Sequence, residues 1–94
     1  MRFVLHPAAA DDLAAIRRYI ENDSPAAASR TAALLLAAMQ HLTDTPHIGR
    51  PGRWPHTREL IVPPYVIPYR VKGQVVEILR VFHSAREWPD RPAA

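Results

Sequence analysis

A histidine and a group of arginines in the C-terminal half are the residues whose types could support chemistry. An imidazole gains or loses a proton near neutral pH, so His83 could act as a general acid or base. A guanidinium group holds a phosphate or a carboxylate with two parallel hydrogen bonds. The arginines that could supply such contacts are Arg58, Arg70, Arg80 and Arg86. Together these residue types could serve phosphodiester cleavage without a metal ion, which needs an acid, a base and cations around the phosphorus.

The same residues also have structural interpretations, and the sequence leaves them open. His83 lies at the end of an expected strand, where it could simply hydrogen-bond a backbone carbonyl group. The arginines could pair with Glu59, with Glu77 or with carboxylates of a partner protein. Trp88 could close the edge of the core instead of stacking on a base.

Length and composition predict one domain spanning residues 1–94, with residues 90–94 as a frayed tail. The chain has no cysteine, which excludes disulfides and thiolate metal sites. The histidines His41, His47 and His56 follow no metal-ligand spacing, so we expect no metal and no cofactor. No apolar run of about 18 residues and no signal-peptide pattern is present, so we expect a cytoplasmic protein without membrane contact.

The charge is distributed unevenly along the chain. Residues 1–46 carry four arginines and five acidic residues, a net charge of −1. Residues 47–94 carry seven arginines, one lysine and four acidic residues, a net charge of +4. A basic patch of this kind predicts an acidic partner or a nucleic acid.

Two helices are expected in the N-terminal half, over residues 8–21 and from Pro25 to Thr43. Apolar residues recur at helical spacing in both segments. Ser24 is a typical N-cap and Pro25 suits the first helical position, so a short link joins the helices into an antiparallel hairpin. Leu34 and Leu36 lie outside the apolar stripe of the second helix. That helix therefore either packs on two sides or offers a surface to another protein.

The loop from Asp44 to His56 contains three prolines and two glycines, so we expect no regular structure there. Loops of this length in small domains are often functional. Arg53 and Trp54 could bind a partner, or they could only hold the loop in place.

Four strands are expected, over residues 2–6, 57–62, 65–71 and 74–82, with Lys72-Gly73 as a two-residue hairpin turn. The order of elements is then β-α-α-β-β-β. This order predicts an α+β fold in which the helical hairpin packs on one face of a mainly antiparallel four-stranded sheet. We expect the other sheet face, with its arginines, to remain exposed.

Several short motifs occur in a characteristic order across nearly the whole chain. They are F-V-L-x-P-x-A-x-x-D-L-x-x-I over residues 3–16, G-R-P-G over 49–52, T-R-E-L over 57–60, Y-x-I-x-Y-R-V over 65–71, and V-E-I-L-R-V-F-H-S-A-R-E-W over 76–88. With these motifs the chain resembles the RelE/ParE superfamily, the toxins of type II toxin–antitoxin systems. The resemblance implies the same fold and a cognate antitoxin that is small, acidic and partly disordered.

The resemblance implies two alternative activities. RelE-like members are ribosome-dependent endoribonucleases that cut mRNA, and ParE-like members bind and poison DNA gyrase. Arg86 matches an arginine that RelE-like nucleases use, and a RelE-like reading would make His83, Arg86, Arg80 and Arg58 catalytic. The chain lacks the additional lysines on the middle strands and the C-terminal Tyr or His of those enzymes. Its H-x-A-R-x-W ending and its G-R-P-G loop are closer to ParE-like chains.

A ParE-like reading makes the protein a gyrase inhibitor of the plasmid-stabilization type. The toxin–antitoxin complex would be hetero-oligomeric and would bind operator DNA through the antitoxin. The residues expected to bind the antitoxin or another partner are Leu34, Leu36, Arg53, Trp54 and Arg70. A third alternative is a degenerate member that has lost toxicity and serves only as a partner of its antitoxin.

Overall fold

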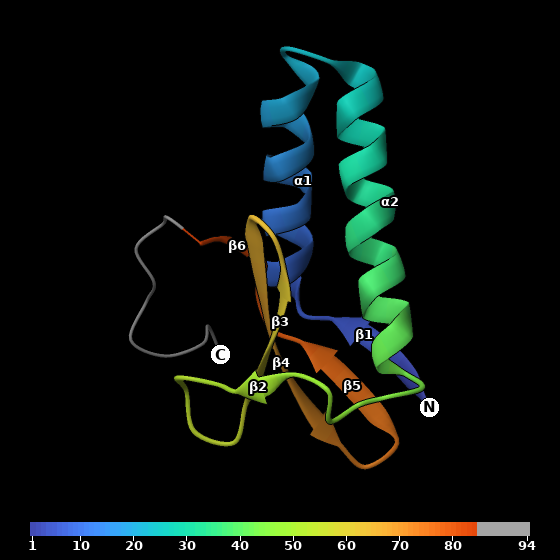
Figure 1. Ribbon diagram of the computed structural model, residues 1–94, viewed down its shortest axis with the longest axis vertical. Helices are drawn as coiled ribbons and strands as arrows, with labels where there is room; N and C mark the ends of the chain where they lie inside the picture. Colours follow the sequence, from blue (N-terminus) through green and yellow to red (C-terminus); the bar gives the residue numbers. More distant parts are fainter. Residues whose placement is uncertain (85–94) are drawn as a thin grey trace.

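The computed structural model describes residues 1–84, which form two helices and six strands (Figure 1). In chain order they are β1 Arg2–Leu5, α1 Pro7–Glu21, α2 Pro25–Leu42, β2 Arg50–Pro51, β3 Arg58–Val62, β4 Tyr65–Lys72, β5 Val75–Ile78 and β6 Phe82–His83. The predicted α+β fold is confirmed. No helix among these residues is long and apolar enough to cross a membrane.

The strands form one sheet in the order β1-β5-β4-β3-β2, and β6 pairs with β4. β1 runs parallel to β5, while the other pairs are antiparallel. β1 and β5 are connected through both helices and the strands β2, β3 and β4, a connection long enough for the crossover that a parallel pair needs. β2, the strand that follows the helices, lies at the other edge of this strand order.

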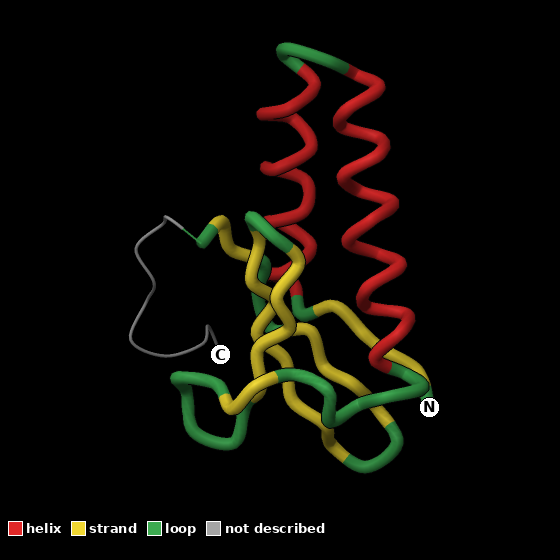
Figure 2. Tube along the Cα trace, viewed as in Figure 1, coloured by secondary structure: helices red, strands yellow, loops and turns green. Residues whose placement is uncertain are grey.

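The helical hairpin is confirmed. Ser24 has extended backbone angles and its Oγ accepts a hydrogen bond of 3.1 Å from the backbone N–H of Ala27, as an N-cap does. Pro25 begins α2 directly afterwards. The two helices run antiparallel, and their connected end extends beyond the sheet (Figures 1 and 2).

The core lies between the hairpin and one face of the sheet. Its fully buried side chains include Leu35 and Met39 from α2 and Ile67, Tyr69 and Ile78 from the sheet. A second, smaller cluster lies apart from this core and consists of Trp54, Leu79 and Phe82. Trp54 meets Phe82 edge to face at 6.2 Å between ring centroids, so the loop residue closes over strand residues.

The expected strand over residues 74–82 is interrupted. Tyr69 lies opposite Ile78, but Val66 lies opposite Phe82, so the second segment has gained one residue relative to β4. This extra residue is a β-bulge, which turns the side chains that follow it to the other face. For this reason Phe82 joins the cluster of Trp54 and not the helix-covered core that contains Ile78.

Two further predictions about turns are corrected. The hairpin turn is Gly73-Gln74, one residue later than expected, because Lys72 still pairs with Val75. Gly73 has φ +61°, which a glycine adopts without strain at the first position of a type II′ turn. The loop over residues 44–56 is not entirely irregular, because Arg50 and Pro51 form β2 against β3.

The prediction that the arginines line one exposed sheet face is wrong. Residues directly opposite each other in an antiparallel pair point to the same face. Arg58 lies opposite the core residue Tyr69 and so belongs to the helix-covered face, whereas Arg70 is the next residue on β4 and faces the other way. Arg80 turns toward α1, where it contacts Asp12.

Candidate functional site

The structure separates His83 from Arg58. His83 lies in β6 opposite Tyr65, and the two rings meet edge to face at 5.8 Å. Arg58 lies opposite Tyr69, four residues further along β4, or about 13 Å. A proton-transfer group and a phosphate-binding cation whose backbones are separated by four strand residues do not converge on one phosphodiester in this conformation.

Arg80 is held by a carboxylate. Its Nε and Nη2 donate to the two carboxylate oxygens of Asp12 at 2.7 and 3.0 Å, and the backbone N–H of Val81 donates to the same side chain at 2.9 Å. The hydrogen bonds that Arg80 donates to Asp12 raise the pKa of Arg80 above its usual value. The guanidinium also lies 4.6 Å from the centroid of the Phe82 ring. Arg80 therefore joins α1 to the bulge between β5 and β6.

Arg58 and Arg70 also have partners, but each retains donors that no residue within 1–84 binds. Nη1 of Arg58 donates to the carbonyls of His47 and Gly49 at 3.2 and 2.8 Å. Nε of Arg70 donates to Glu77 at 2.6 Å, and Nε2 of His6 lies 3.1 Å from the other oxygen of that carboxylate. The bonds from Arg70 and then His6 lower the pKa of Glu77. These intramolecular hydrogen bonds therefore occupy some of the N–H donors of each arginine.

Arg86 and Trp88 lie outside the described residues. Among residues 1–84, the candidates His83, Arg58 and Arg80 are not brought together. This part of the chain also contains no cluster of three or more His, Asp or Glu side chains that could hold a metal ion.

Glu59 anchors the loop that precedes β3, a role that sequence reasoning missed. It is only 3% exposed. One carboxylate oxygen accepts from Nε and Nη2 of Arg50 at 3.1 and 2.8 Å, and the other accepts from the backbone N–H of Arg53 at 2.9 Å. A glutamate near the start of a strand, shortly after the loop arginines Arg50 and Arg53, is the sequence signal that could have indicated this role.

Tyr69 fixes the first part of the same loop. Its hydroxyl donates to the carbonyl of Pro46 at 2.8 Å and accepts from the backbone N–H of Gly49 at 2.9 Å. Burial raises the pKa of Tyr69 above its usual value of 10.0. A Cβ at position 49 would lie 2.6 Å from that hydroxyl, so only glycine fits there. This contact explains the first glycine of the G-R-P-G motif.

Replacing Tyr69 with Phe is expected to destabilise the protein by about 1–3 kcal/mol, because the buried N–H of Gly49 loses its acceptor. Urea denaturation measures the loss. Tyr19→Phe is the matched control, since Tyr19 is 75% exposed and its change should be within about 0.5 kcal/mol. Equal stabilities of the two variants would contradict the anchoring role of Tyr69.

The residues expected to bind a partner lie in three different environments. Leu34 and Leu36 are 56% and 43% exposed on α2, so they offer apolar surface. Arg53 and Arg70 are partly exposed and lie beside Glu59 and Glu77. Trp54 differs, because it is 3% exposed and its side chain packs in the second cluster. In this conformation Trp54 stabilises the loop and does not form contact surface.

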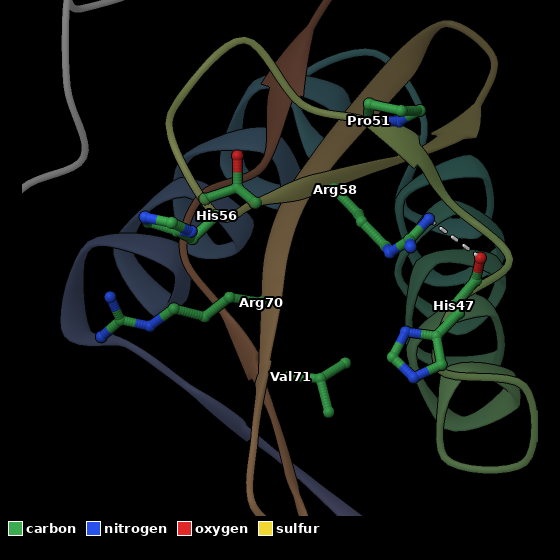
Figure 3. Close-up of a pocket in the computed structure, with 7 residues that line it drawn as sticks. His47, Pro51, His56, Arg58, Arg70 and Val71 are labelled. Carbon is green, nitrogen blue, oxygen red and sulfur yellow. Dashed lines mark hydrogen bonds between the residues drawn. The ribbon is translucent and has the colours of Figure 1, made fainter.

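One pocket of about 350 Å³ lies beside the first residues of β3, where the C-terminal end of β4 extends beyond its pairing with β3 (Figure 3). Its lining residues are His47, Pro51, His56, Thr57, Arg58, Arg70 and Val71. None of them is acidic. Two guanidinium groups and two imidazoles therefore give this pocket a basic lining.

Curated relatives cover most of the chain. Toxin Y4kP of Sinorhizobium fredii is 47% identical over 76 residues, which are 79% of this chain and 78% of the relative. Toxin RelE2 of Caulobacter vibrioides is 44% identical over 75 residues, or 80% of this chain and 85% of the relative.

A solved structure and a family model agree with these relatives. The structure titled "Chromosomal ParDE TA system from P. aeruginosa" superposes with a TM-score of 0.78 at 30% identity, over 88% of this chain and 95% of that one. The model of the family described as the ParE toxin of the type II toxin–antitoxin system, parDE, matches residues 3–88. The six strands, the helical hairpin and the sequence thus lead to one assignment: the chain belongs to the ParE toxin family.

Proposed function

We propose that this toxin inhibits growth by binding DNA gyrase, without cleaving RNA, and that a cognate antitoxin neutralises it. The observation that carries the proposal is the separation of His83, Arg58 and Arg80 within the described residues. His83 pairs with the first residue of β4 and Arg58 pairs four residues further along that strand. Arg80 is held in a bidentate pair by Asp12. A general acid or base acts only within hydrogen-bond reach of the group it protonates.

The relatives' names support a second candidate. Toxin RelE2 carries the name of the nuclease branch and is 44% identical to this chain. A RelE-like mechanism would use His83 as the acid or base, with Arg86, Arg80 and Arg58 on the phosphate, and would act on mRNA at the ribosome. This mechanism requires Arg80 to leave Asp12 and the distant Arg58 to approach His83.

The deciding experiment is expression of the toxin without antitoxin, followed by paired assays of gyrase supercoiling and mRNA integrity. We expect growth arrest, loss of supercoiling activity and intact mRNA. His83→Ala should remain toxic, as should His41→Ala on the exposed side of α2. Cleavage of ribosome-bound mRNA that disappears in His83→Ala alone would reject gyrase inhibition in favour of the nuclease. Normal growth would instead indicate a family member that has lost toxicity and acts only as a partner of its antitoxin.

The antitoxin is proposed to lay a segment along α2. Leu34 and Leu36 are exposed although the same helix already fills the core with Leu35 and Met39. Apolar side chains that stay exposed although the core is filled are available for contact with a partner protein. An acidic, partly disordered segment would cover these leucines and direct carboxylates to Arg53 and Arg70. The resulting complex would be hetero-oligomeric and would contact operator DNA through the antitoxin.

Replacing Leu34 or Leu36 with Glu is expected to weaken antitoxin binding by about tenfold or more, because an acidic segment meets a new negative charge on a formerly apolar contact. Isothermal titration with the co-expressed antitoxin measures the change. Ile61→Glu is the matched control, since Ile61 is 41% exposed on β3. If antitoxin binding is weakened equally in all three variants, the effect is a general effect of charge. That result would rule out α2 as the docking surface.

A further inference from the structure

The net positive charge of the chain is concentrated at one end of the sheet. We define the basic end as residues 46–60 and 69–77, which surround the pocket of Figure 3. It contains five cationic side chains and two carboxylates, a surplus of three charges. These are Arg50, Arg53, Arg58, Arg70 and Lys72, against Glu59 and Glu77. The remaining described residues carry five arginines and five acidic residues, so the chain's net charge of +3 arises here.

Both arginines of the pocket keep donors that no described residue uses. Nη1 makes both hydrogen bonds of Arg58, so its Nε and Nη2 have no partner within residues 1–84. Arg70 uses only Nε, so its two terminal nitrogens likewise have none there. Free guanidinium nitrogens in a lining without carboxylates favour an anionic ligand.

The two arginines point to opposite sides of β4, as Figure 3 shows, because they lie on opposite faces of the sheet. A single small anion would therefore meet only one of them. An extended ligand that crosses the edge of β4 past the start of β3 would meet both in turn. A polymer with regularly spaced negative charges has this property.

The histidines add a second feature, a flat ring face on which a base can stack. His47 and His56 are both exposed at the pocket, and an imidazole face can stack on a base. His56 has φ +61°, a left-handed conformation that is uncommon outside glycine and often occurs at functional positions. The pocket of about 350 Å³ lies within the range of small-ligand sites and exceeds what one carboxylate fills.

We propose that this pocket is a nucleic-acid contact site that holds the backbone of a single strand across the edge of β4 and stacks a base on an imidazole. Arg58 and Arg70 bind successive phosphates, and His56 offers the stacking face. The proposal goes beyond gyrase inhibition and holds whichever target the toxin has. An acidic peptide is the competing ligand, and the test separates the two.

The test measures binding of fluorescein-labelled oligothymidylate and oligouridylate to the purified full chain over a range of salt concentrations. Arg70→Gln is expected to weaken binding about tenfold at low salt. It should also reduce the slope of log affinity against log salt by about 0.7, the value for one lost phosphate on a single strand. Arg30→Gln is the matched control, because it removes the same charge from the exposed surface of α2.

A second variant keeps the test valid if loss of Arg70 disturbs Glu77. His56→Asn leaves that ion pair intact, and asparagine tolerates the left-handed backbone. It should weaken oligonucleotide binding severalfold without changing the salt slope, as loss of stacking does. Equal effects of Arg70→Gln and Arg30→Gln would overturn the proposal, as would a polyglutamate peptide that displaces the oligonucleotide at equal chain length and concentration. A stronger effect with one oligonucleotide would identify the strand as DNA or RNA.

Discussion

Asp12→Asn is expected to lower the free energy of unfolding by about 3 kcal/mol, the lower end of the range for breaking a buried ion pair. The Asp12 side chain is 14% exposed and that of Arg80 is 22% exposed, so solvent compensates little for the lost charge. The amide oxygen can accept at most two of the three hydrogen bonds, and the amide NH2 group places donors against the guanidinium. Chemical denaturation of the purified toxin measures this loss.

The control for Asp12 is its neighbour on α1. Asp11→Asn removes the same charge from an exposed position and should change stability by no more than about 0.5 kcal/mol. Because Asp12 also binds the backbone N–H of Val81, its loss should release the bulge and loosen β6 in hydrogen exchange. Similar stabilities of the two variants would show that this ion pair does not hold α1 to the sheet.

Glu59→Gln is expected to have a comparable effect, about 3 kcal/mol at neutral pH, because several charge-assisted hydrogen bonds to a buried carboxylate are weakened together. Burial acts to raise the pKa of Glu59, but the bonds from Arg53 and Arg50 outweigh it and hold the pKa below its usual value of 4.5. A group with a lowered pKa in the folded state stabilises the protein above the pKa of the unfolded state. That stabilisation is lost as the pH falls through the lowered value.

The pH profile therefore distinguishes the variant from the parent protein. The parent should lose stability as the pH falls below about 4.5, and Glu59→Gln should show a shallower loss. Some acid sensitivity should remain, since the pKa of Glu77 is also lowered. Glu21→Gln serves as the control, because its pair with Arg17 is exposed and contributes little. Identical pH profiles for the parent and Glu59→Gln would contradict the anchoring role of Glu59.

Local sequence signals were sufficient for the helices and for most strands. The N-cap at Ser24 and the proline that follows it depend only on neighbouring residues, and both act as predicted. The exposed positions of Leu34 and Leu36 follow from their offset from the apolar stripe, which is also a local property. The motif order likewise identified the family that the comparisons support.

The candidate site was predicted less well, because its geometry depends on how strands pair. One inserted residue after Ile78 moves Phe82 to the other face, and no local pattern indicates that insertion. The partner of Arg80 is Asp12, from the other end of the chain, and not a nearby strand glutamate. Similarly, the burial of Trp54 required the loop to fold over Phe82.

The sequence by itself determined the helical hairpin, the strand segments, the toxin family and the excess of positive charge in the second half, since periodicity, caps, motifs and composition are properties of the chain. Only the tertiary structure decided which groups hold the arginines and which of their donors no residue within 1–84 binds. It also decided that His83 lies far from Arg58. Strand register and bulges set these relations, and both depend on contacts between residues distant in sequence.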